Sequence, residues 1–136
     1  MTLNNDDNWD KTATLERLER EIITVTDLVH VSHAVSRSKG WYDGEDARRN
    51  IPEMLALLHS EISEALEDYR TQKVPLSTLG LFDEKGKPIG FASEIADVAI
   101  RLGDLCGYLG INLTAAVVEK TTYNKTRPYR HGNKKA

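Results

Sequence analysis

Two segments of about twenty residues each combine an apolar helical repeat with a pair of acidic residues three positions apart. The first segment carries Glu61 and Glu64, and the second carries Glu94 and Asp97. Because side chains three residues apart lie on the same face of an α-helix, each pair presents both carboxylates on one side. The pattern predicts two long helices and restricts how they pack, since buried carboxylates must be neutralised wherever they meet.

The first of these helices is predicted over residues 51–70, with Pro52 in its first turn. At about 100° per residue, three apolar side chains lie within about 60° of Glu61, namely Met54, Leu58 and Ala65. Glu64 lies at the edge of the same apolar face. Glu61 therefore belongs to the apolar face, where an ordinary surface acid is not expected.

The second helix is predicted over residues 91–109. Glu94 lies within about 40° of Val98 and Leu105 on its apolar face, and Asp97 lies on the flank of that face. Acidic pairs at this spacing are common on exposed helices, so one pair alone is weak evidence. The same inward placement in two separate helices favours one shared site.

A site of this composition suits hard divalent cations that prefer oxygen ligands, above all Mg²⁺. Phosphoryl or nucleotidyl transfer is the chemistry that it favours, because metal ions bridge phosphate oxygens and lower the pKa of a bound water molecule. No Glu-x-x-His pair accompanies the acids, which argues against a di-iron carboxylate bundle.

The remaining segments predict an all-α protein with a single domain. Residues 1–12 are polar and aperiodic and are expected to form a flexible N-terminal arm. Further helices are predicted over about 13–36 and about 112–125. Residues 73–90 lack a helical period and are compatible with a small hairpin. We expect a four- to five-helix bundle over residues 13–136, with this irregular or hairpin insertion between its second and third helices and a basic tail at its C-terminus.

Two further features of the sequence need a partner. The loop over residues 38–46 contains two adjacent aromatic residues, Trp41 and Tyr42. They either cover one end of the bundle or offer a stacking surface for a flat ligand such as a nucleobase. Lys120 is predicted at the middle of the inward face of the fourth helix. A lysine there requires an anion, either a carboxylate of the site or a phosphate.

The formal net charge of −3 hides an uneven distribution. Residues 120–136 contain six basic residues and no acidic one, which leaves 12 basic and 21 acidic residues, a charge of −9, in residues 1–119. An acidic body with a basic tail suits a protein that binds both metal ions and an anion, although such a tail also serves solubility alone. One short basic segment is a poor electrostatic footprint for nucleic acid, which argues against that partner.

Cysteine content and hydropathy indicate the compartment. Cys106 is the only cysteine, so no internal disulfide can form and a reducing compartment is favoured. The sequence has neither an N-terminal apolar signal region nor an apolar run near about 18 residues. Secretion and membrane spanning are therefore not expected, and we expect a cytoplasmic protein.

The two acidic pairs resemble the E-x-x-E and E-x-x-D motifs of MazG-like proteins, which belong to the all-α nucleoside-triphosphate pyrophosphohydrolase superfamily. The resemblance includes the surrounding residues 56–65 and 94–102 and the basic segment 120–132, and it follows the family order over about 35–135. The 29 residues between the two motifs, residues 65–93, form a longer gap than in many relatives.

The resemblance implies an enzyme that hydrolyses a nucleoside or deoxynucleoside triphosphate to the monophosphate and pyrophosphate, by attack of metal-activated water. It implies Mg²⁺, for which Mn²⁺ often substitutes, bound by Glu61, Glu64, Glu94 and Asp97. Glu61 and Glu64 are the candidates for the catalytic base. By the same resemblance four residues match substrate-contacting positions: Trp41 for the base, and Lys120, Asn124 and Arg127 for the phosphates or sugar.

The resemblance also implies a homodimer or homotetramer with a role in nucleotide-pool control. Some phage-encoded relatives act on purine deoxynucleotides such as dGTP. The residues allow one alternative, a non-catalytic helical oligomer whose inward acids pair with Lys120 and Arg101 in a structural salt-bridge network. That alternative predicts no metal-dependent activity and little change in thermal stability with Mg²⁺.

Overall fold

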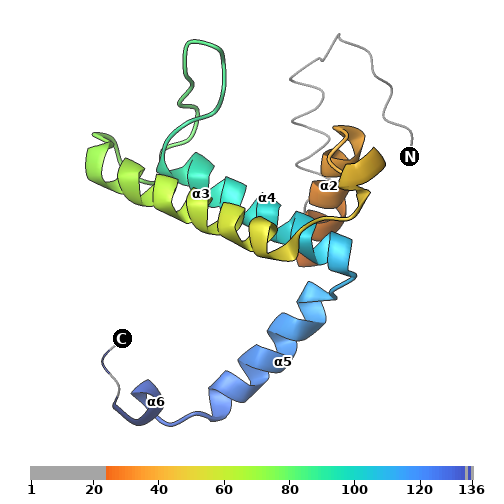
Figure 1. Cartoon of the computed structure of the whole chain (residues 1–136). Helices are drawn as coiled ribbons and strands as arrows, with labels where there is room; N and C mark the ends of the chain where they lie inside the picture. The colour runs from red at the N-terminus through yellow and green to blue at the C-terminus, as the bar shows by residue number, and fades with distance from the viewer. Residues whose placement is uncertain (1–23, 134, 136) are drawn as a thin grey trace.

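The computed structural model describes residues 24–133 and 135, and this part of the chain is helical (Figure 1). Its elements are α2 (Val25–Ser38), a short 3-10 helix η1 (Gly44–Ala47), α3 (Ile51–Thr71), α4 (Phe91–Leu109), α5 (Leu113–Thr126) and α6 (Arg130–Asn133). The predicted all-α class is confirmed, and the described residues contain no strand. The predicted N-terminal arm and the first half of the helix predicted over 13–36 lie outside the described residues.

The helix predicted over 13–36 is not continuous, because Thr24 has an extended backbone and caps the start of α2. The Thr24 side chain accepts a hydrogen bond from the backbone N–H of Asp27, and the Asp27 carboxylate accepts one from the backbone N–H of Thr24. This reciprocal capping box satisfies donors that a helix start leaves unpaired. The apolar period across 13–36 did not reveal the interruption, because a cap depends on side-chain hydrogen bonds rather than on hydropathy.

Helices α3 and α4 lie side by side and run in opposite directions (Figure 1). Their bounds agree with the predicted ones to within a residue. Asn50 caps α3 by accepting a hydrogen bond from the backbone N–H of Glu53, and Pro52 occupies the first turn. Gly110 ends α4 in the left-handed conformation, at a φ of 66°, which glycine adopts without steric cost.

Helix α2 packs closely against the second half of α4, because α4 presents two glycines to it. A Cβ atom added at Gly107 would lie 2.5 Å from the Cβ of His33, and one added at Gly103 would lie 2.8 Å from the Ser32 Oγ. Ser32 and Gly103 are both buried. The absence of side chains at these two positions therefore sets the distance between the helices.

The connection between α3 and α4 projects from one end of the pair (Figure 1). Gln72 ties its two ends together: the Gln72 Oε1 accepts a hydrogen bond from the Phe91 backbone N–H at 2.8 Å, and the Gln72 amide donates to the Val74 and Pro75 carbonyls. Further along, Phe82 and Pro88 form an isolated antiparallel bridge.

Helix α5 extends away from α3 and α4 (Figure 1). Its first turn contacts α2, where the Thr114 and Thr26 hydroxyls lie 2.9 Å apart. No residue of α5 is buried. Within the described residues no helix has the length and apolar character needed to cross a membrane.

Candidate metal centre

Three carboxylates from the two paired helices converge at one place. Glu61 of α3 and Glu94 and Asp97 of α4 each offer an oxygen, and these three oxygens lie within 4.8 Å of one another. Glu61 and Glu94 are buried, at 7% and 6% exposure, and Asp97 is half-buried. The predicted inward placement of Glu61 and Glu94 is therefore correct. Oxygens this close and this shielded from water repel one another strongly unless a cation or a proton neutralises them.

Glu94 has an unpartnered oxygen. Its Oε2 is fully shielded from solvent and has no hydrogen-bond partner among the described residues. Burial raises the pKa of Glu94 above its ordinary value, and the nearby charges of Glu64 and Asp97 raise it further. A buried carboxylate oxygen without a donor is rare, because the desolvation cost is not repaid. The Glu94 carboxyl is therefore not neutralised by a hydrogen bond from the described residues, which leaves a proton or an external cation to do so.

Asp97 shows the same electrostatic pattern. Burial raises its pKa, and the charge of Glu61 adds to the effect, while Lys87 and Arg101 partly offset it. Among the described residues no ion pair to Asp97 is present. Two carboxyls of one cluster thus have raised pKa values for the same two reasons, shielding from water and repulsion by neighbouring acids.

Glu64, the fourth predicted ligand, lies at the margin of this cluster. Its side chain is exposed, and it is not among the three carboxylates that converge. Its charge nevertheless raises the pKa of both Glu94 and Asp97, so it faces the same region. The difference follows from its place at the edge of the apolar face of α3, about 60° from Glu61.

One protein cation already touches the cluster. The Arg101 Nε donates a short hydrogen bond to the Glu61 Oε1 and forms an ion pair with it. Arg101 follows Asp97 by four residues on α4, so it lies one turn further along the same face. This contact is the one that the structural-network alternative predicts for Arg101.

Lys87 is a second cation that the sequence did not single out. Its charge lowers the pKa of both Glu94 and Asp97 against the larger effect of burial. It lies in the connection between α3 and α4, where the backbone N–H groups of Lys85 and Lys87 donate to the Asp83 Oδ1. The sequence did not predict that Lys87 acts on these carboxylates, because an aperiodic segment does not show which part of the helices it approaches.

Trp41 is more than half exposed and is stacked against an arginine. The Arg49 guanidinium carbon lies 5.6 Å from the Trp41 ring centroid and 5.7 Å from that of Tyr42. The Arg49 Nη1 also donates to the Trp41 carbonyl at 3.0 Å. Arg49 and Arg101 both line a small cavity of about 30 Å³, together with Met54, Leu57 and Asp104. Arg49, next to the exposed indole, and Arg101, next to Glu61, thus line the same cavity.

Tyr42 holds the aromatic loop on the helices. Its hydroxyl donates to the Asp104 Oδ1 at 2.9 Å, and the His33 Nδ1 lies 2.9 Å from the same oxygen. Burial and the bond to Asp104 raise the pKa of Tyr42, so it remains a neutral donor. Tyr42 also packs edge-on against the His33 ring. Each aromatic residue therefore fits one of the two alternatives left by the sequence. Tyr42 covers the helices, whereas the Trp41 ring is exposed to solvent and could stack on a flat ligand.

The prediction that Lys120 faces inward is wrong for the single chain. Lys120 and Asn124 are exposed on α5, and Arg127 is half-buried just after it. The Lys120 Nζ lies 5.8 Å from the Tyr123 ring centroid on the same helix. The physical reason is that α5 has no continuous apolar face to hold it against α3 and α4, so its cations do not meet the acids within this chain.

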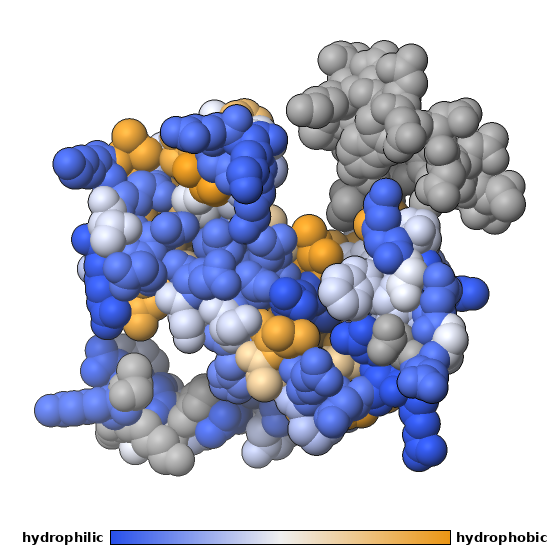
Figure 2. All heavy atoms as spheres, turned by 45° about the horizontal axis from the view of Figure 1, so that its top comes forward, coloured by the Kyte–Doolittle hydropathy of each residue, from blue (hydrophilic) through white to orange (hydrophobic). Residues whose placement is uncertain are grey.

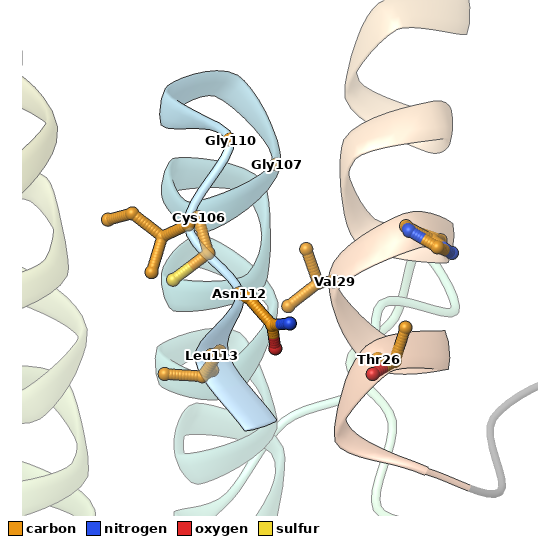
Figure 3. A pocket seen from close by; sticks show the side chains of 9 residues that line it. Thr26, Val29, Cys106, Gly107, Gly110, Asn112 and Leu113 are labelled. Carbon is orange, nitrogen blue, oxygen red and sulfur yellow. The ribbon is translucent and has the colours of Figure 1, made fainter. Parts of the chain in front are cut away.

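A larger cavity of about 300 Å³ lies between the start of α2 and the end of α4 (Figure 3). The side chains of Val29 and Asn112 point into the space between these helices. Its lining residues are Thr26, Val29, His30, Cys106, Gly107, Gly110, Ile111, Asn112 and Leu113. Burial raises the pKa of the Cys106 thiol, which keeps it protonated. The cavity contains none of the clustered carboxylates, so its size does not mark it as the site of metal chemistry.

Compared with models of known protein families, with characterised proteins and with solved structures, the chain matches none.

Proposed function

We propose that this protein is a Mg²⁺-dependent nucleoside-triphosphate pyrophosphohydrolase of the MazG-like kind. The observation that carries the proposal is the buried Glu94, whose Oε2 has no partner among the described residues and whose carboxylate offers an oxygen within 4.8 Å of oxygens of Glu61 and Asp97. An acidic cluster on a surface would need no ion. A shielded, unpartnered carboxylate at the centre of one needs either a proton or a cation, and among the described side chains Lys87 offsets its charge only in part.

The donor set fits a hard divalent cation. Glu61, Glu94 and Asp97 supply carboxylate oxygens, and Glu64 faces the same region from the margin. Among the residues that the structure describes, no sulfur or imidazole belongs to the cluster, so Mg²⁺ or Mn²⁺ suits it better than Zn²⁺. Bound there, Mg²⁺ would neutralise phosphate charge and supply an activated water for hydrolysis.

The chain's own residues provide the other requirements of a triphosphate site. Trp41 presents an exposed ring, a surface on which a nucleobase can stack. Arg49 lies beside that ring, in a position suited to phosphate oxygens. Glu64, exposed and next to the cluster, can accept a proton, and Glu61 remains the other candidate for this role. The products would be a nucleoside monophosphate and pyrophosphate.

The structural-network alternative is supported by one contact, the pair between Arg101 and Glu61. It requires the other acids to be neutralised as well. Lys120, its second cation, is exposed on α5, and neither Glu94 nor Asp97 has an ion pair among the described residues. Because one pair accounts for one carboxylate only, the enzymatic proposal is the better supported of the two.

The test is a hydrolysis assay. The purified protein is incubated with a panel of nucleoside and deoxynucleoside triphosphates with Mg²⁺, and the products are separated by HPLC. We expect monophosphate and pyrophosphate from at least one substrate, loss of activity with EDTA, and a decrease of more than about tenfold for Glu64→Gln. Activity that survives EDTA would remove the metal argument. Failure to hydrolyse any nucleotide would favour the structural network.

We further propose that the chain assembles as a homodimer or homotetramer. Four large apolar residues of α3 recur on one helix face and are each about half exposed: Leu55, Ile62, Leu66 and Tyr69. Apolar side chains are likewise visible among the hydrophilic ones in the space-filling view (Figure 2). No apolar side chain among the described residues is below 2% exposure. A row of this kind on a small domain is typical of a subunit interface.

Replacing Ile62, which is 50% exposed, with glutamate is expected to shift the assembly to a lower mass, because a buried charge at an apolar contact is costly. The measurement is light scattering after size-exclusion chromatography. Leu79→Glu, at an exposed position in the connection between α3 and α4, is the charge-matched control and should leave the mass unchanged. A wild-type chain that elutes as a monomer at micromolar concentration would refute this assembly.

A further inference from the structure

We propose that Arg101 is a built-in counter-cation of the metal-free site, which a divalent ion displaces from Glu61 when it binds. The inference rests on the proposed function, since it requires that the cluster binds a metal. It explains how the negative charge of the site is partly neutralised when no metal is bound, and it names a residue that sets the metal affinity of the site.

The contact between Arg101 and Glu61 is direct. The Arg101 Nε donates to the Glu61 Oε1, and the Glu61 side chain is 9% exposed, whereas the Arg101 side chain is 41% exposed. Glu61 is therefore held in the protein interior, while the guanidinium keeps a side open to solvent. Of the two partners Arg101 is the one that can leave, because its charge can be hydrated at little cost.

The metal and Arg101 require the same carboxylate. Glu61 supplies one of the three oxygens that lie within 4.8 Å of one another, so an ion held by these oxygens would lie close to the guanidinium. Two cations at such a distance in a partly buried place repel each other strongly. Asp97 and Glu94 have no ion pair among the described residues, so Arg101 neutralises only part of the cluster. Without metal, the ion pair with Arg101 thus stabilises the site, but the negative charge of the carboxylates there is only partly neutralised.

A second carboxylate lies one helical turn beyond Arg101 on α4. Asp104 follows Arg101 by three residues on α4, and both line the cavity of about 30 Å³. The hydrogen bonds that Asp104 makes to His33 and Tyr42 both go to its Oδ1. A guanidinium that leaves Glu61 therefore has both an adjacent space and an adjacent anion.

The experiment is titration calorimetry with Mn²⁺ alone, without nucleotide, on the wild-type protein and on Arg101→Gln. Removing the competing cation is expected to raise Mn²⁺ affinity by about three- to tenfold, the worth of one charge-assisted hydrogen bond that is partly solvent-screened. Arg70→Gln is the charge-matched control, because Arg70 is exposed and pairs with Glu67 on the surface of α3. It should change the affinity by less than about twofold.

A second measurement makes the outcome decisive. In the wild-type protein, the Arg101 Nε–H signal in a ¹H–¹⁵N spectrum, assigned by its loss in Arg101→Lys, should shift on addition of Mg²⁺.

Wild-type binding of Mn²⁺ with unchanged or weaker binding by Arg101→Gln would overturn the inference and leave the proposed function standing. An unshifted Arg101 Nε–H signal at saturating Mg²⁺ would overturn it in the same way, even if the variant does not fold. Absence of any metal binding by the wild-type protein would instead refute the proposed function, and the inference with it.

Discussion

Replacing Glu94 with glutamine is expected to abolish Mg²⁺-dependent hydrolysis of nucleoside triphosphates, with a loss of more than about 100-fold. Glu94 is the most buried of the clustered carboxylates, and its Oε2 has no partner in the described part of the chain. Glutamine has nearly the same shape but cannot offer an anionic oxygen. The increase in melting temperature that Mg²⁺ gives the wild-type protein should disappear in the variant.

Without metal, the same variant is expected to be more stable than the wild type at pH 8. Burial and neighbouring acids raise the pKa of Glu94 and of Asp97, so the folded protein holds these protons more tightly than the unfolded chain. Stability therefore falls as the pH rises from the unfolded values, roughly 4, through the raised folded values, and it does not fall further above them. Glu94→Gln removes one such group, and its stabilising effect should shrink as the pH approaches 4.

Differential scanning fluorimetry across pH 4–8, with EDTA or with Mg²⁺, measures both effects. Glu67→Gln is a suitable control, because Glu67 is exposed on α3 and pairs only with Arg70 among the described residues. It should leave both the pH profile and the Mg²⁺ response unchanged. A Glu94→Gln protein that is less stable than the wild type in EDTA at pH 8 would mean that this carboxylate has a structural partner.

Gly107→Ala is expected to lower the free energy of unfolding by about 2 kcal/mol, which is roughly 10 °C in melting temperature for a domain of this size. The added Cβ would lie 2.5 Å from the Cβ of His33, an atom next to the backbone that cannot rotate away. Helices α2 and α4 must therefore separate. The gain in helix propensity from glycine to alanine, about 1 kcal/mol, offsets only part of this cost.

Thermal and urea unfolding measure this change. His33→Ala in the same chain should not restore stability, because it keeps the clashing Cβ, whereas His33→Gly should restore part of it. Since His33 also contacts Asp104, each double variant is compared with its own single variant. A Gly107→Ala protein as stable as the wild type would show that the two helices are not held at this distance.

The helical segments were largely predictable from the sequence because they depend on local interactions. The bounds of α3 and α4 follow from apolar period, a proline in the first turn and a glycine after the end. The same angular reasoning placed Glu61 and Glu94 in the interior, which the structure confirms. It also placed Glu64 at the edge of the face, where the structure finds it exposed.

The helix predicted over about 112–125 is present as α5, but the prediction that Lys120 faces inward was wrong, because an angular position on one helix does not say whether that face meets another element. After the turn at Gly110 the chain leaves α3 and α4, so no face of α5 packs against them. Lys120 and the other residues of α5 are therefore not buried. In the same way, nothing in the spacing of Arg49, Tyr42 and Asp104 indicated that they come together. Two hydrogen bonds in this region, from the Tyr42 hydroxyl to Asp104 and from the Arg49 backbone N–H to the Tyr108 hydroxyl, join residues about 60 positions apart.

The sequence by itself determined that α3 and α4 form and that each buries one acid, because helix formation and amphipathic burial are set by residues within a few turns of each other. Only the tertiary structure decided which carboxylates converge, that Arg101 rather than Lys120 pairs with one of them, and that Glu94 keeps an oxygen without a partner in the described part of the chain. The physical reason is that charge pairing depends on distances of a few ångströms between α3 and α4, and these distances are set by how the two helices pack together.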